Sequence, residues 1–262
     1  MGPMNTRKKE SQRHVEALLK ALEILDCFES HPSLSLKQIS EITGLNKSRI
    51  IRLCGTLEAK RYLTYDANRS LYSLGSRLLS LGKAYERRNT LISLARPILA
   101  ELARRTGESV SLHVMDGLER MCLVREEGTF NVRHHTSEGL HLPLYAGAGS
   151  KVLLCYAPEE IKQRVLKKHL LKRFTPTTLT DPSLLEKEFE KIRRDGYAFS
   201  RGERDPDAGA LAAPVFNQEK TVVAAMVITG PINRLSPENH GKYVSHLLPC
   251  SQKLSQALGF TP

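Results

Sequence analysis

The chain has 262 residues, of which 40% are hydrophobic, and it carries 39 Lys and Arg against 28 Asp and Glu. Such a chain is long enough to bury a substantial core and to form two domains. Its longest apolar run, residues 222–228, is too short to span a bilayer, and its N-terminus lacks the apolar segment of a signal peptide. We therefore expect a cytoplasmic protein without membrane contact, and the positive charge favours an acidic polymer as a partner.

Residues 1–12 include the charged run Arg7-Lys8-Lys9-Glu10 and are predicted to form a disordered tail. An amphipathic helix is predicted next, because apolar residues recur at helical spacing over 15–28. These residues are Val15, Leu18, Leu19, Leu22, Leu25 and Phe28.

Two short helices joined by a tight turn are predicted after Ser35. Ser35 and Gln38 have the Ser-x-x-Gln spacing of a capping box, so the first helix begins at Leu36. Gly44 ends that helix, because glycine readily adopts the positive φ of a helix C-terminus. Asn46 is then the N-cap of the second helix.

Apolar and basic residues separate onto two faces of the second helix. The residues predicted to face inward are Ile50, Ile51, Leu53 and Leu57. The residues predicted to face outward near its start are Lys47, Ser48, Arg49 and Arg52. Recognition helices meet base edges and phosphates with such early positions.

A basic hairpin follows, with strands at 62–65 and 71–74 and a turn at 66–70. Three helices and a hairpin are the layout of a winged helix-turn-helix DNA reader, and Arg69 at the tip is placed to reach phosphate or a minor groove. The predicted DNA-contacting residues are Ser35, Gln38, Asn46, Lys47, Ser48, Arg49, Arg52, Asn68 and Arg69.

A basic helix face can also be merely solvated, and helix-turn-helix patterns occur in proteins that bind no DNA. The location of the charge favours DNA binding, because residues 1–88 hold 16 Lys and Arg against 9 Asp and Glu, whereas the remainder holds 23 against 19. Binding that neutralises phosphates is predicted to weaken steeply as salt rises.

Residues 76–89 are predicted to be a linker helix, and a second helical period runs to Arg105 with Gly107 as its cap. The pattern then changes to that of strands, with Asp116-Gly117 as a hairpin turn. The domain is therefore predicted to be α+β, with a mixed antiparallel sheet flanked by helices. Its other expected elements are strands at 110–114, 121–125, 197–200, 211–217 and 221–229, and helices at 183–194 and 235–258.

Several segments occur in an order and spacing typical of one family: Leu22–Phe28, Tyr72–Gly75, Leu142–Ala146, Gly196–Ala198, Ala212–Val215 and Gly230–Leu235. Over almost its whole length the chain resembles an IclR-type (isocitrate lyase regulator type) transcription factor. The resemblance implies a winged helix-turn-helix domain (13–75), a linker helix (76–89) and a GAF-like effector-binding and oligomerisation domain (90–262). It also implies homodimers, or dimers of dimers, on palindromic double-stranded operator DNA.

The resemblance further implies that a small molecule lies against the sheet. By position, its contacts are Ala146, Gly147, Ala148, Gly149, Ser150, Ser200, Glu203, Ala210, Val227 and Thr229. Small residues before a helix let backbone amides approach a ligand, and a helix N-terminus attracts anions.

Acid-binding members of the family often carry Asp, Cys and two Ser where this chain has Ser200, Ala210, Val227 and Thr229. An aromatic or partly apolar organic acid is therefore expected. Arg201 and Arg204 would either pair with its acid group or belong to a solvated loop.

No metal or cofactor is expected. Four histidines have no recognised ligand spacing and are interpreted as strand or surface residues: His113, His134, His135 and His141. The five cysteines are interpreted as free thiols, and the core positions Cys122 and Cys155 have no obvious activating partner.

Three functions fit the sequence. An effector-responsive DNA-binding regulator accounts for both domains. An architectural DNA binder would use its second domain only to oligomerise. An enzyme fused to a DNA-binding module would need a catalytic constellation, and the sequence indicates no catalytic residue.

Overall fold

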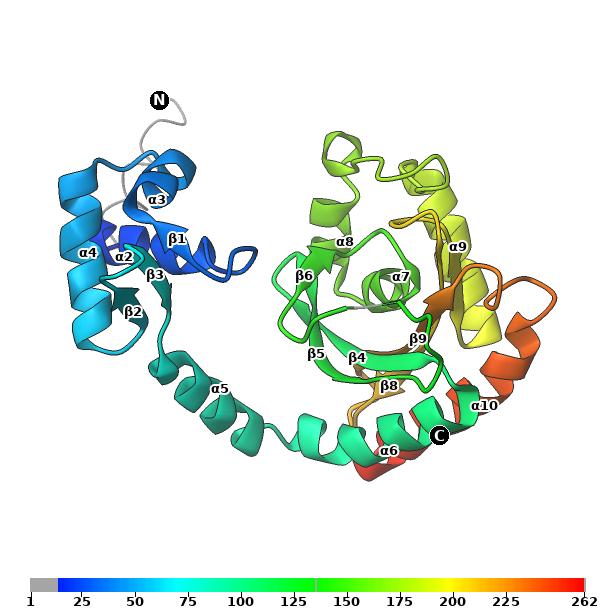
Figure 1. Cartoon of the computed structure of the whole chain (residues 1–262). Coiled ribbons are helices and arrows are strands. Elements are labelled where there is room, and N and C mark those ends of the chain that lie inside the picture. The colour runs from blue at the N-terminus through cyan, green and yellow to red at the C-terminus, as the bar shows by residue number, and fades with distance from the viewer. Residues whose placement is uncertain (1–13, 135, 262) are drawn as a thin grey trace. The chain divides into compact units, whose positions relative to one another are not determined.

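The computed structural model describes residues 14–134 and 136–261, and the chain divides into two compact units, residues 1–88 and 89–262 (Figure 1). Each unit has its own hydrophobic core. The predicted tail at residues 1–12 and the histidine at position 135 lie outside the described residues.

The N-terminal unit joins helices to a small sheet of order β1-β3-β2, in which both pairs are antiparallel. Its helices are α2 (Glu16–Asp26), α3 (Leu36–Thr43), α4 (Lys47–Ala59) and α5 (Ser76–Arg88). Its strands are β1 (Leu34–Ser35), β2 (Leu63–Asp66) and β3 (Leu71–Leu74).

The local signals of the helix pair are confirmed. Ser35 and Gln38 form the capping box, and Gly44 ends α3 with φ 69°. The Asn46 side chain accepts a hydrogen bond from the Arg49 amide at the start of α4. Each of these signals depends on residues within one turn, so the sequence alone determines it.

The predicted inward face of this unit is buried only in part. Ile50 of α4 is fully buried, whereas Ile51 is 52% exposed, because successive residues of a helix point about 100° apart. The helix α2 contributes its last turn to the core through Ile24, and Phe28 just after the helix is also buried there. Its earlier apolar residues, predicted to cap the helix pair, are exposed: Val15, Leu18, Leu19 and Leu22.

The C-terminal unit is an α+β domain. Its helices are α6 (Thr90–Thr106), α7 (Ala148–Cys155), α8 (Glu159–Val165), η1 (Lys168–Leu170), α9 (Pro182–Asp195) and α10 (His240–Ala257). Its strands are β4 (Ser109–Asp116), β5 (Glu119–Glu126), β6 (His141–Pro143), β7 (Ala198–Arg201), β8 (Ala208–Phe216) and β9 (Val222–Pro231).

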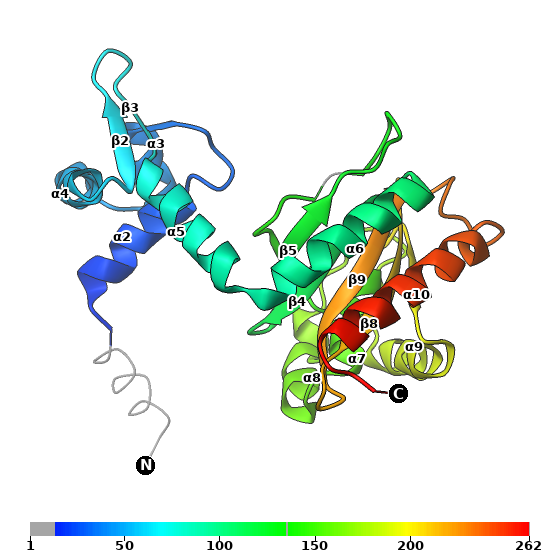
Figure 2. The ribbon, with the colours of Figure 1, turned by 90° about the horizontal axis from the view of Figure 1, so that it is seen from below.

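The sheet has the order β6-β5-β4-β9-β8-β7, and each neighbouring pair is antiparallel. Figure 2 shows α6 and α10 side by side across one face, where they share a core with alternate residues of the strands. The helices α7 and α9 pack with the opposite face. The predicted layering of helices on both sides of an antiparallel sheet is confirmed.

Two parts of this unit differ from the sequence prediction. The last helix begins at His240 rather than near Leu235, because Pro237 disfavours a helical conformation of the residue before it. The short elements α8 and η1 were not predicted, since they are too short for a hydrophobic period to define.

An ion pair with a buried carboxylate joins the start of β4 to the end of β9. Glu108, just before β4, is fully buried, and its two carboxylate oxygens accept hydrogen bonds from Nε and Nη2 of Arg234, which follows β9. The Tyr243 hydroxyl lies 3.5 Å from the same carboxylate.

Replacing Arg234 by Met should lower the free energy of unfolding by about 3 kcal/mol, because the Glu108 carboxylate would stay buried without its cation. Urea denaturation of the purified protein measures this. The double variant with Glu108→Gln should recover part of the loss, and an unchanged urea midpoint for Arg234→Met would contradict the assigned role.

Candidate functional site

The start of α4 presents polar side chains to solvent. Lys47, Ser48 and Arg52 are exposed, as predicted. Arg49 is partly buried, because its Nη2 atom lies 2.8 Å from Oε1 of Glu16 in α2. The sequence did not indicate this pair, which engages one of the nitrogens of the guanidinium.

Three of the predicted DNA-contacting residues serve first as helix caps. The Ser35 amide donates to Oε1 of Gln38 at 2.9 Å, and the Gln38 amide donates to Oγ of Ser35 at 3.3 Å. The Asn46 side chain accepts from the Arg49 amide and from the Ser48 hydroxyl, each at 2.9 Å. Their side chains therefore shape the start of each helix.

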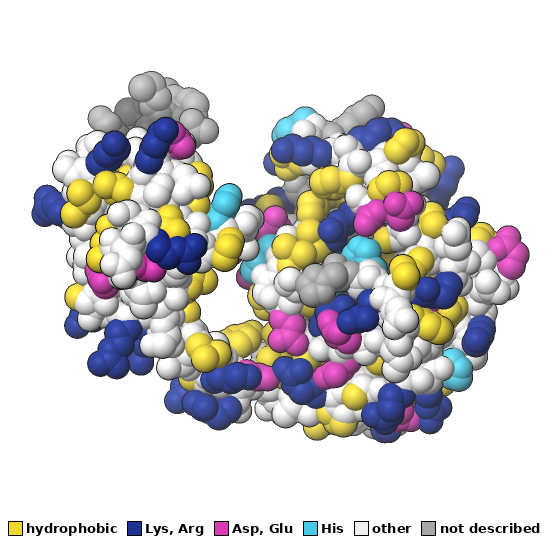
Figure 3. All heavy atoms as spheres, in the orientation of Figure 1, with side chains coloured by type: hydrophobic (Ala, Val, Ile, Leu, Met, Phe, Trp, Pro, Cys, Tyr) yellow, Lys and Arg dark blue, Asp and Glu magenta, His cyan; other side chains and the backbone are white. Residues whose placement is uncertain are grey.

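The turn of the hairpin is built around an aspartate. Oδ1 of Asp66 accepts hydrogen bonds from the amides of Asn68 and Arg69, which leaves both of those side chains exposed at the tip. On the face drawn in Figure 3, the basic side chains of this unit are spread out rather than gathered into one patch.

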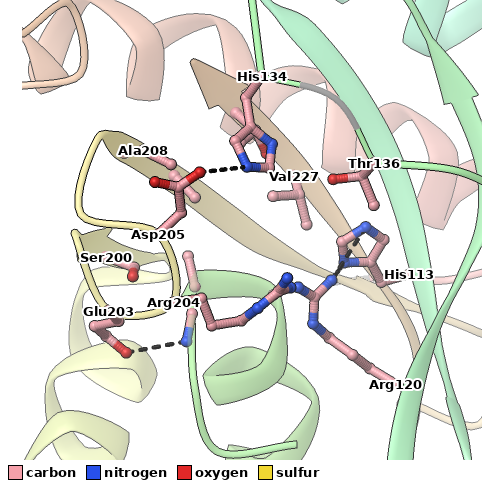
Figure 4. A pocket seen from close by; sticks show the side chains of 16 residues that line it. His113, Arg120, His134, Thr136, Ser200, Glu203, Arg204, Asp205, Ala208 and Val227 are labelled. Atoms are coloured by element: carbon pink, nitrogen blue, oxygen red, sulfur yellow. Dashed lines mark hydrogen bonds and ion pairs between the residues drawn. The ribbon is translucent and has the colours of Figure 1, made fainter. Parts of the chain in front are cut away.

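The C-terminal unit has a cavity beneath the start of α7 (Figure 4). Its empty space, counting the open mouth, is about 480 Å³. Eight of the ten predicted effector-contacting residues line it: Gly147, Ala148, Gly149, Ser200, Glu203, Ala210, Val227 and Thr229. The other two do not, because Ala146 is enclosed in the core and Ser150 turns away to donate to the Pro143 carbonyl at 2.7 Å.

Strand register explains how distant residues meet at the cavity. Ser200, Ala210 and Thr229 lie directly opposite one another on β7, β8 and β9. Val227 is two residues before Thr229 and so points to the same face of the sheet. Gly149 lies against this wall, and a Cβ atom there would be 2.8 Å from Cγ2 of Val227 and 2.9 Å from Nδ1 of His113.

Four basic side chains also line the cavity: His113, Arg120, His134 and Arg204. None of them is among the ten predicted contacts, although Arg204 was weighed as a partner of the acid group. His113 was interpreted as a strand or surface residue; it lies in β4 but is only 2% exposed. Neighbouring side chains of a strand point to opposite faces of the sheet. Because Leu112 belongs to the core on one face, His113 had to point to the other face, where the cavity lies. Arg204 had been weighed against a solvated loop, and its pKa is lowered chiefly by burial.

His113 is held as a neutral hydrogen-bond acceptor. Nη1 of Arg120 donates to its ring, and its Nε2 atom lies 3.0 Å from the Ser111 hydroxyl. Burial, and then the charges of Arg120 and Arg204, lower the pKa of His113 well below 6.5. Burial lowers the pKa of Arg120 to about 9, so the guanidinium remains charged at pH 7.

The carboxylate of Glu203 is already occupied. Oε2 accepts a hydrogen bond from the Gly147 amide at 3.0 Å, and Oε1 lies 2.6 Å from Nζ of Lys151, which is 1% exposed. Lys151 also donates to the Phe199 carbonyl and to Glu188. Glu203 therefore anchors the start of α7, and it also lines the cavity in which the prediction placed it.

The other candidate groups have internal partners. His134 lies 3.6 Å from Asp205, and His141 lies 2.8 Å from Asp116. Among the described residues, no group of three His, Cys, Asp or Glu side chains is arranged to hold a metal ion. The prediction of free thiols is confirmed, and burial raises the pKa of Cys122 to about 11.

The fold and the site define a class of protein: a winged helix-turn-helix unit with an exposed basic helix end, joined in one chain to a unit with a cavity lined by both apolar and polar groups. The family model of the IclR helix-turn-helix domain matches residues 17–67, and that of the bacterial transcriptional regulator IclR C-terminal domain matches residues 83–256. The chain belongs to the IclR family of ligand-controlled, DNA-binding transcriptional regulators.

Individual relatives agree over nearly the whole chain. The HTH-type transcriptional regulator KipR of Bacillus subtilis is 31% identical over 250 residues, which are 95% of this chain and 100% of KipR. The IclR regulator of Alicyclobacillus acidocaldarius is 28% identical with a TM-score of 0.83, over 93% of this chain and 98% of that one. An IclR homolog from Microbacterium hydrocarbonoxydans, complexed with 4-hydroxybenzoate, shares the fold with a TM-score of 0.82, at 23% identity over 93% and 99% of the chains.

Acidification should destabilise the protein through His113. Below pH 6.5 the unfolded chain takes up a proton at His113, whereas the folded protein excludes it. The free energy of unfolding therefore decreases as the pH falls from 6.5 toward the lowered pKa of the folded state. The melting temperature of wild type minus that of His113→Gln should therefore decrease between pH 7 and pH 5. A difference that stays constant with pH would mean that His113 is not held neutral.

Proposed function

We propose that the chain binds a palindromic operator through the start of α4 and the tip of the β2–β3 hairpin, and that a small organic acid in the cavity controls this binding. The observation that carries the proposal is the cavity itself, because it is enclosed by small residues and by basic side chains in a unit separate from the reader. Ligand pockets typically combine an apolar lining with a few converging polar groups.

On the DNA side, the proposal assigns contacts to Lys47, Ser48, Arg49 and Arg52 of α4 and to Asn68 and Arg69 of the hairpin. All of these side chains except that of Arg49 are exposed, which supports this role. Arg49 is partly buried but lies in the first turn of α4. Ser35, Gln38 and Asn46 would act mainly by fixing the two helix starts, with backbone amides near phosphate.

On the ligand side, the complex of the Microbacterium hydrocarbonoxydans homolog with 4-hydroxybenzoate supports an aromatic acid as one candidate for this chain. The arginines in the cavity support an acid of either aromatic or aliphatic type. The cavity would bind rather than transform its ligand, because neither Cys122 nor Cys155 is among the described residues that line it. Burial also raises the pKa of both thiols, which makes them poor nucleophiles.

A palindromic operator has two half-sites and requires two DNA-binding domains, so we propose that the chain works as a homodimer or a dimer of dimers. The compartment would be the cytoplasm, where bacterial operators are found. Among the helices of residues 14–134 and 136–261, none has both the length and the apolar character of a membrane-spanning segment.

Arg52→Ala should weaken binding to DNA from the region upstream of the gene by about 1–3 kcal/mol if Arg52 contacts a base, and should leave the oligomeric state unchanged. Gel-shift titrations at several salt concentrations measure this. Arg104→Ala, an exposed arginine of α6, is the matched control and should bind normally. The regulator proposal fails if wild type gives no sequence-specific, salt-sensitive shift.

Gly149→Ala should abolish the response to the effector and leave effector-free operator binding intact, because the new methyl group would narrow the cavity between Val227 and His113. Gel shifts with and without 4-hydroxybenzoate and a panel of other organic acids measure the response. Gly241→Ala is the control, since nothing lies within 4 Å of a methyl group added there. If no acid alters wild-type binding, the chain would instead be an architectural DNA binder.

A further inference from the structure

Two guanidinium groups enter the cavity from different elements. Arg120 comes from β5 and is 6% exposed, and Arg204 comes from the loop between β7 and β8. Figure 4 shows their guanidinium groups pointing toward one another beside His113. Like charges repel more strongly in a buried site than in water. The ligand-free protein therefore holds this pair at an energetic cost.

The acidic groups around the cavity do not neutralise Arg120. Both oxygens of Glu203 are engaged elsewhere, by the Gly147 amide and by Lys151. Asp205 adjoins Arg204, favours the charge of that residue, and lies 3.6 Å from His134.

The hydrogen bonds of the Arg120 guanidinium within the described chain run to His113, which is uncharged. In the part of the chain that the structure describes, Nε of Arg120 is buried with no hydrogen-bond partner. Buried polar groups of native proteins are almost always satisfied, and a buried cation is normally paired. Arg120 therefore has both an uncompensated charge and an unused donor facing the cavity.

We propose that the effector is a carboxylate whose acid group binds between Arg120 and Arg204, with His113 as the residue that positions Arg120. The inference rests on the proposed function and adds which groups recognise the acid. A carboxylate fits because its two oxygens match the fork of donors on a guanidinium. The remainder of the ligand then lies toward Gly149 and Val227, and the α7 amide that Glu203 occupies takes no part.

The first arm of the test needs no ligand. Arg120→Met keeps most of the side-chain volume and removes the charge, so the melting temperature of the ligand-free protein should rise by about 2 °C or more. The matched control is Arg125→Met in the same strand. Arg125 is paired with Glu127 and hydrogen-bonded to Ser109, so its loss should lower the melting temperature.

The second arm compares acids with uncharged analogues. The probes are benzoate, 4-hydroxybenzoate, pyruvate and succinate, each matched with its amide. An acid that stabilises wild type in thermal-shift assays should lose its effect as the amide. The affinity of Arg120→Met or Arg204→Gln for that acid should fall by about tenfold or more. His113→Leu should lose affinity, and His113→Gln should retain it, because glutamine keeps an acceptor for Arg120.

The outcomes separate the inference from the proposed function. If Arg120→Met destabilises the protein as Arg125→Met does, or if it keeps the response to the acid, then Arg120 is structural and the inference is wrong, whereas the regulator stands. An amide that stabilises wild type as well as its acid also overturns the inference. If no probe changes wild type in thermal shift or gel shift, the acid-controlled function fails, and the first arm still decides the role of Arg120.

Discussion

The buried ion pair between Glu203 and Lys151 is the constraint on which the cavity depends. It joins the loop after β7 to the start of α7, since one oxygen of Glu203 holds the Gly147 amide and the other holds Lys151. A buried carboxylate without these partners would cost several kcal/mol, about the net stability margin of many domains. The same pair also fills a helix N-terminus that would otherwise attract a ligand anion. Our proposal therefore assigns recognition of an acid to the arginines.

The loop that carries Glu203 is itself held by neighbouring hydroxyls. Thr178 donates to the Glu203 carbonyl and Thr175 donates to the Gly202 carbonyl, both at 2.6 Å. These bonds fix the backbone on either side of Glu203, so Arg204 projects from a restrained position. A binding residue on a restrained loop loses less conformational entropy when its ligand arrives. The same short segment thus holds the start of α7 and carries the arginine that we propose binds the acid.

The sequence predicted interactions between neighbouring residues correctly, and it missed interactions between residues far apart in the chain. Capping by Ser35 and Asn46 depends on neighbouring residues and could be predicted, as could the strands that alternate in hydrophobicity. The predicted effector-contacting residues came from a family resemblance, and strand register explains why four of them meet at the cavity. Arg120 was missed because nothing local distinguishes it from a solvated arginine. The Glu16–Arg49 and Glu203–Lys151 pairs join residues far apart in the chain, so only the fold reveals them.

The charge of the arginine pair also bears on how a ligand would control DNA binding. A ligand shifts an equilibrium only by the difference in its affinity for the two states. An anion between Arg120 and Arg204 changes a repulsive contact into an attractive one, so its binding free energy depends steeply on their separation. On the Arg204 side, that separation depends on the loop that Glu203 ties to the Gly147 amide and to Lys151. We expect a neutral ligand of the same shape to lack this attraction, so that it neither draws the two guanidinium groups together nor stabilises the protein as the acid does.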